Sequence, residues 1–159
     1  MLTSATIRSV LSSIGLGCCA LAVASSVQAA DASGPGVDAV RQKAAEVGGL
    51  DPIEPNPQWT PDGGVFQFYN DGDAAIYWSA ATGAHLVHGD ILGEWRARGF
   101  EDSLGYPIED EGEPAAFCGD GAERSQAFSK GTSLCWRPDI FTPDGLLTEA
   151  AVWEAVQVI

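Results

Sequence analysis

The stretch IYWSAATGAHLVHGDILGEWRARGFEDSLGYP, residues 76–107, determines how this chain is organised. Its first residues, 76–78, are β-branched or aromatic and therefore favour a strand. Thr82-Gly83 has the chemistry of a turn, because glycine adopts a positive φ without strain. Residues 85–88 have the composition of a return strand, which Gly89 ends. The pattern therefore predicts a β-hairpin.

A short helix and a rigid corner are predicted to follow this hairpin. Asp90 is placed to cap the helix, and Ile91 and Trp95 share one helical face because they lie four residues apart. Gly99 can end the helix. The LGYP sequence at 104–107 predicts an elbow, since proline fixes its own φ and holds the preceding residue extended.

Five short motifs follow one another in this stretch: IYWS at 76–79, TGAH at 82–85, V-x-G-x-I at 87–91, a tryptophan four residues later, and LGYP at 104–107. Together they resemble the LGFP repeat family. That resemblance implies a non-catalytic module of secreted and cell-wall proteins of actinobacteria, which anchors them by binding arabinogalactan. The ligand is an implication of the family and does not follow from composition or periodicity.

Aligned with itself, the chain shows an internal repeat. Trp78 matches Trp136, and Phe68 matches Phe128. We place the first repeat at 37–89 and the second at 90–159, each running helix, proline elbow and β-hairpin. The fold class predicted is a small single α+β domain of two LGFP-like repeats with one disulfide.

The remaining elements are predicted from composition and spacing. Residues 37–47 have the apolar periodicity of a helix, whereas the four prolines of 51–61 predict an extended connector. Alternating strand residues at 65–78 and 125–136 predict two hairpins. After Thr148, the spacing of Val152, Val156 and Ile159 predicts a final helix with Trp153 on its core side.

The first 29 residues have the features of a signal peptide. Arg8 supplies a weak basic region, an apolar segment follows, and small residues precede Ala30, where we expect the mature chain to start. Residues 30–36 are predicted to be a linker. Cys18 and Cys19 leave a lipoprotein as an alternative. The predicted location is secreted and cell-wall associated.

The charge balance excludes several partners. The chain has 8 Lys and Arg against 22 Asp and Glu, a formal charge of −14. Such a surface repels nucleic acid and anionic membranes but not a neutral polysaccharide. Cell-wall polysaccharide, the partner that the resemblance implies, is therefore not excluded. The alternatives are a scaffold that binds a wall enzyme, and self-association.

The exported segment has two cysteines, Cys118 and Cys135, which we predict to form a disulfide. Two free buried thiols are the alternative. The pair lacks the C-x-x-C spacing of a redox or zinc site, and no further soft ligand lies nearby.

The sequence predicts neither an enzyme nor a cofactor. Gly131-Thr132-Ser133-Leu134-Cys135 only approximates a nucleophile elbow, and no histidine follows His88. The carboxylates of residues 109–113 are predicted to lie in a solvated loop with no apolar pocket around them. A hydrolase or esterase is therefore a minor alternative. His85 and His88 would point to opposite faces of a strand, and no metal site is predicted. Calcium at residues 70–73 remains an alternative to simple turn chemistry.

Aromatic side chains are the candidates for ligand contact, because flat rings stack on sugar faces. Trp95 and Trp153 are expected in the core. The residues proposed to contact a ligand are Trp78, His85, Tyr106 and Trp136, although His85 is expected first to form a hydrogen bond within its turn.

Overall fold

The computed structural model describes residues 33–138, 140–141, 147–148 and 151–156. The predicted signal peptide, the cysteines of the lipoprotein alternative and residues 30–32 of the predicted linker lie outside these residues. The described elements are α1 (Pro35–Val47), β1 (Gln58–Trp59), β2 (Val65–Tyr69), η1 (Asn70–Gly72), β3 (Ala74–Ser79), β4 (Gly83–His88), α2 (Gly89–Ala97), η2 (Phe100–Asp102), η3 (Ala116–Cys118), β5 (Arg124–Ala127), β6 (Thr132–Arg137), β7 (Ile140–Phe141), β8 (Leu147–Thr148) and β9 (Ala151–Val156).

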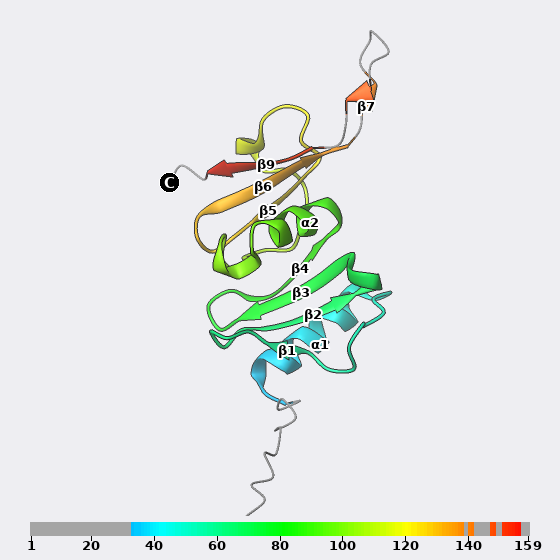
Figure 1. The fold of residues 1–159 in the computed structure, drawn as a ribbon, viewed down its shortest axis with the longest axis vertical. Helices are drawn as coiled ribbons and strands as arrows, with labels where there is room; N and C mark the ends of the chain where they lie inside the picture. Colours follow the sequence, from blue (N-terminus) through cyan, green and yellow to red (C-terminus); the bar gives the residue numbers. More distant parts are fainter. Residues whose placement is uncertain (1–32, 139, 142–146, 149–150, 157–159) are drawn as a thin grey trace, which may run out of the picture.

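Helices and sheets alternate along the long axis of the molecule (Figure 1). Helix α1 covers one face of the antiparallel sheet β1-β2-β3-β4, and α2 lies between that sheet and the second sheet, β5-β6-β9. The short strands β7 and β8 pair with each other and extend beyond the second sheet. The predicted α+β class is confirmed.

Two hydrophobic clusters hold this stack together, one on each face of the first sheet. Between α1 and the sheet, Val37 and Val40 pack against Val65, Tyr69 and Ile76. These positions of β2 and β3 alternate with residues that face α2, as side chains on a strand must. Both faces of the first sheet therefore carry mainly apolar side chains, which explains why its strands show no polar face.

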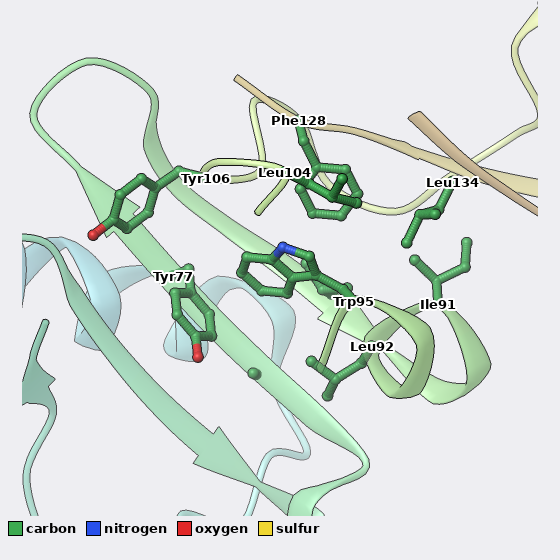
Figure 2. Close-up of a cluster of buried hydrophobic side chains, with 10 residues drawn as sticks. Tyr77, Ile91, Leu92, Trp95, Leu104, Tyr106, Phe128 and Leu134 are labelled. Carbon is green, nitrogen blue, oxygen red and sulfur yellow. The ribbon is translucent and has the colours of Figure 1, made fainter. Parts of the chain in front are cut away.

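The larger cluster surrounds Trp95, which is fully buried (Figure 2). Its ring centroid lies 4.6 Å from Tyr77 of the first sheet and 5.1 Å from Phe128, which follows β5 of the second. Leu104 of the LGYP elbow packs into the same cluster. The expectation that Trp95 lies in the core is confirmed, and its indole joins the two repeats.

Matching backbone hydrogen bonds show the internal duplication. Pro52 bridges to Tyr69 in the first unit, and Pro107 bridges to Phe128 in the second. Trp78 pairs with Val65, which lies four residues before Tyr69. Trp136 pairs with Arg124, which lies four residues before Phe128. The predicted match of Trp78 with Trp136 is therefore confirmed. The match of Phe68 with Phe128 is wrong by one residue, because the structural equivalent of Phe128 is Tyr69.

The LGYP elbow depends on its glycine. Gly105 has φ of +84°, and a Cβ there would lie 2.2 Å from Ser129 Oγ and 3.0 Å from the backbone nitrogen of Lys130. This close approach lets Lys130 donate its backbone N–H to the carbonyl of Leu104, and Ser129 donate its own to the carbonyl of Tyr106. Only glycine satisfies both the positive φ and the close contact.

The predicted C-terminal helix is wrong. Residues 151–156 form β9, which pairs antiparallel with β6 and places Trp153 opposite Cys135. The spacing of Val152 and Val156 fits a helical face, but β-branched and aromatic residues within 151–156 also favour a strand. Strand β6 has an edge left open by β5, and pairing there satisfies its backbone groups. Trp153, predicted to be core, is only half-buried.

The predicted disulfide between Cys118 and Cys135 is present. By the register of the two sheets, Cys135 occupies the position that Tyr77 holds in the first sheet. Tyr77 faces α2, whereas Cys135 is tied to η3 in the segment before β5. The disulfide thus covers the end of the stack, where a further helix would otherwise be needed.

Candidate functional site

The acidic connector, residues 109–113, joins the two sheets. The backbone N–H of Glu111 donates to the carbonyl of Leu86 on β4 at 3.1 Å, and Asp110 Oδ1 accepts from the N–H of Leu86 at 2.9 Å. On its other side, Gly112 exchanges two backbone hydrogen bonds with Ser125 of β5. Four of its five residues are exposed, as the prediction of a solvated loop requires, but its carboxylates also satisfy the open edge of β4.

Glu111 is the most buried carboxylate of this connector, with a side chain 3% exposed. Its Oε2 accepts from the backbone N–H of His88 at 3.1 Å, and its Oε1 accepts from Arg124 Nη1 at 3.1 Å. A His88 ring nitrogen lies 3.7 Å from the same carboxylate. A buried charge needs such partners, so Glu111 fixes Arg124 and His88 at the junction of the two repeats.

A cleft of about 180 Å³ opens beside this junction. In it, Trp136 Nε1 donates to Asp90 Oδ2 at 2.7 Å, and the guanidinium of Arg124 lies over the indole at 5.7 Å from its centroid. We call this the inter-repeat cleft, and its lining residues are Gly89, Asp90, Ile91, Glu111, Arg124 and Trp136.

The chemistry of the inter-repeat cleft suits a small polar ligand. Arg124 offers N–H donors and Asp90 offers a carboxylate acceptor, and both are exposed. The half-buried indole of Trp136 provides an apolar surface between them. The cleft is smaller than the roughly 300 Å³ at which drug-sized pockets begin. Its size therefore matches a single ring of a larger molecule.

Trp78, the equivalent tryptophan of the first repeat, has a different environment. A Cβ on Gly36 would lie 2.5 Å from Trp78 Cε3, so the start of α1 packs directly on this indole. The cross-strand partner of Trp78 is the fully buried Val65. The partner of Trp136 in the second repeat is Arg124. Both tryptophans lie at the start of the helix that covers their sheet, but only Trp136 lines a polar cleft.

His85 forms a hydrogen bond inside its turn. Its Nε2 lies 2.8 Å from the carbonyl oxygen of Thr82, and since that oxygen accepts, Nε2 carries the proton. Its Nδ1 lies 3.6 Å from Asp110, which also accepts from Lys43. Although burial raises the pKa of Asp110, the hydrogen bonds from Lys43 and the Leu86 amide outweigh it, and the pKa is lowered.

Tyr106 is buried in the elbow, with 8% of its surface exposed. Its hydroxyl contacts Thr60 Oγ1 at 2.8 Å and donates to Asp62 Oδ1, and Gly64 leaves the room that the ring needs. Burial and the hydrogen bond to Asp62 raise the pKa of Tyr106. The hydrogen bonds from Tyr106 and Thr60 lower the pKa of Asp62. The ring fastens the elbow to the β1–β2 loop.

The acidic turn at residues 70–73 has structural partners for two of its oxygens. Asn70 Oδ1 accepts from the backbone N–H of Asp51 at 2.9 Å, and the carbonyl of Gly72 accepts from Arg96 at 3.0 Å. Asn70 and Asp71 have positive φ. Across the part of the chain that the structure describes, no three His, Cys, Asp or Glu residues are grouped to hold a metal ion.

Of the four predicted ligand residues, Trp136 alone lines the inter-repeat cleft. Local sequence patterns do not indicate Arg124 or Glu111 as its neighbours, because the cleft forms only when the connector docks between two sheets. Asp90 was expected to cap α2, but His88 is the N-cap residue, and the Asp90 carboxylate accepts from Trp136 instead. The periodicity of β6 could have placed Trp136 beside α2, but not its polar partners.

Comparison with known proteins supports the resemblance seen in the sequence. No curated protein matches the chain. The model of the LGFP repeat matches residues 52–103, which run from the first elbow through β4 and α2 to the end of η2. LGFP repeats are typical of cell-surface proteins. Within the described residues, no helix has the length and apolar character to cross a membrane. This match supports assigning residues 52–103 to the LGFP repeat family.

Proposed function

We propose that this protein is a non-catalytic, cell-wall-associated module that binds a neutral envelope polysaccharide of the arabinogalactan type through the inter-repeat cleft. The observation that supports the proposal is the arrangement of Trp136, Arg124 and Asp90 around one small opening. An indole, a guanidinium and a carboxylate at that spacing provide the apolar contact and the hydrogen bonds that a sugar ring requires.

The fixed position of Arg124 contributes to the proposed binding. Glu111 and the His88 ring hold its guanidinium before any ligand arrives. A side chain that is already ordered loses less conformational entropy on binding. The net charge of −14 also favours neutral sugars over wall polymers that are rich in phosphate.

Retention on immobilised, protein-free arabinogalactan tests the proposal. We expect the wild type to be retained and Arg124→Gln and Asp90→Asn to lose at least tenfold in affinity. Arg41→Gln is the matched control, because Arg41 is an exposed arginine on α1 outside the cleft. Equal retention of Arg124→Gln and the wild type would overturn the cleft assignment, and a wild type that flows through would overturn the glycan as ligand.

A second assay separates binding from hydrolysis. Wall fragments incubated with the protein should release no sugar or lipid, since the proposal assigns no reaction to the cleft. Turnover that Asp90→Asn abolishes would replace the binding function with an enzymatic one.

A further inference from the structure

A second opening lies between α1 and the first elbow, on the far side of the first sheet from the inter-repeat cleft. Its volume is about 330 Å³, near the lower limit of small-ligand pockets. We call it the α1–elbow cleft, and its lining residues are Arg41, Ala44, Ala45, Leu50, Pro52, Pro55, Gln67 and Tyr69. Apart from Arg41 and Gln67, this lining is apolar or aromatic.

The duplication shows what fills the corresponding space in the second repeat. Tyr69 is the equivalent of Phe128, because each pairs with the proline of its own elbow. Against Phe128 lies the indole of Trp95 from α2, with 5.1 Å between ring centroids. Helix α1 has no aromatic residue, and Ala44 and Ala45 face the cleft beside Tyr69. The first repeat thus keeps the walls of a tryptophan site without the tryptophan.

We infer that the α1–elbow cleft binds a tryptophan side chain of a partner protein. The second repeat of this chain places an indole from a polypeptide against the same elbow surface, which argues for that occupant. Pro52, Pro55 and Leu50 present apolar surface to a flat ring. Tryptophan is also one of the residues enriched among the side chains that dominate protein interfaces.

Gln67 supplies a polar contact in this cleft. Its Nε2 donates to the Glu54 carbonyl at 2.7 Å, and its Oε1 accepts from the Tyr69 hydroxyl at 2.9 Å. An amide oxygen has two lone pairs, so Oε1 retains one for an indole N–H. Because Gln67 is held by both bonds, its orientation is set before binding. The cleft therefore offers a fixed acceptor to a ring that carries a donor.

Amide chemical shifts of the full chain, followed by nuclear magnetic resonance, test this inference. N-acetyl-tryptophanamide should shift the signals of Ala44, Ala45 and Tyr69 in a saturable manner. N-acetyl-leucinamide should need at least a tenfold higher concentration for the same change. Shifts that do not saturate, or equal responses to the two probes, would overturn the inference.

Two substitutions connect the binding to this cleft. Ala45→Arg blocks the exposed rim of the cleft and should weaken binding of the tryptophan probe at least tenfold. Gln42→Arg, on α1 outside the lining, should leave probe binding unchanged. Ala44→Trp should fill the cleft, raise Tm and abolish probe binding. If Ala44→Trp does not fold, Ala45→Arg still decides, and a response equal to that of the wild type refutes the site.

The glycan and tryptophan sites can fail independently. Arg124→Gln should leave the tryptophan probe response unchanged, and Ala45→Arg should leave retention on arabinogalactan unchanged. Sedimentation of the free protein tests whether the tryptophan that binds in the cleft comes from a second copy of this chain or from a different protein. A dimer that Ala45→Arg converts to monomer would assign the cleft to a second copy and overturn the proposal of a different partner, whereas a monomer supports it.

Discussion

Gln67 and Gln126 make the same hydrogen bond in the two repeats. Each donates through Nε2 to the carbonyl two residues after the elbow proline, Glu54 at 2.7 Å and Glu109 at 2.5 Å. The surroundings of the two amides then diverge. Gln67 Oε1 accepts from the Tyr69 hydroxyl, whereas Gln126 Oε1 is buried without a hydrogen-bond partner, because Phe128 replaces that tyrosine.

Replacing Tyr69 with phenylalanine should therefore destabilise the first repeat. The change leaves Gln67 Oε1 without its donor in a site where Tyr69 is 2% exposed, and we expect a loss of about 1–2 kcal/mol. Urea unfolding measures it. The reverse change, Phe128→Tyr, supplies a donor near Gln126 and should cost less than Tyr69→Phe. An unchanged midpoint for Tyr69→Phe would contradict the role of this bond.

Replacing Gly105 with alanine should strongly destabilise the elbow. Its φ of +84° and the close contacts with Ser129 and Lys130 together predict a cost of about 2–4 kcal/mol. Gly93→Ala is the matched control. Gly93 lies within α2, is exposed and has open space at its Cβ position, so alanine there should stabilise by about 0.5–1 kcal/mol. Equal effects of the two substitutions in thermal unfolding would disprove the elbow argument.

Removing the disulfide should lower stability by about 3 kcal/mol, because a cross-link over 17 residues restricts the unfolded chain. The double variant Cys118→Ala, Cys135→Ala tests this by thermal unfolding. A reductant should lower the Tm of the wild type toward that of the variant and leave the variant unchanged. A variant as stable as the oxidised protein would show that the end of the stack does not need this cover.

Alkaline titration should reveal the buried tyrosines. Burial raises the pKa of Tyr69 to about 12, and burial also raises the pKa values of Tyr77 and Tyr106 above the ordinary 10.0. A raised pKa in the folded state gives stability that is complete below pH 10 and is lost as the pH rises toward 12 and beyond. The ultraviolet absorbance of tyrosinate should therefore remain low near pH 10 in the folded protein.

The same titration in urea is the control. All three tyrosines of the chain should then ionise near pH 10, since the unfolded state removes their burial. A folded protein that gives the same titration curve as the unfolded one would mean that these hydroxyls are exposed to water.

The sequence alone determined most local elements of this protein. The hairpin of β3 and β4, the helix α2 and the LGYP elbow follow from short-range chemistry, since turn glycines, a fixed proline φ and helical spacing act within a few residues. The tryptophans at 78 and 136 were matched correctly for the same reason. Their positions are fixed by strand alternation counted from their own hairpins.

Tertiary structure decided the C-terminal strand, the connector and the cleft. Residues 151–156 fit a helix by spacing and a strand by composition, and the open edge of β6 selected the strand. Asp110 and Glu111 have the composition of a solvated loop, yet they satisfy an edge of β4 that exists only once the sheet has formed. Hydrogen bonds and burial between segments far apart in sequence are absent from local patterns, so the surroundings of Trp136 became visible only in the fold.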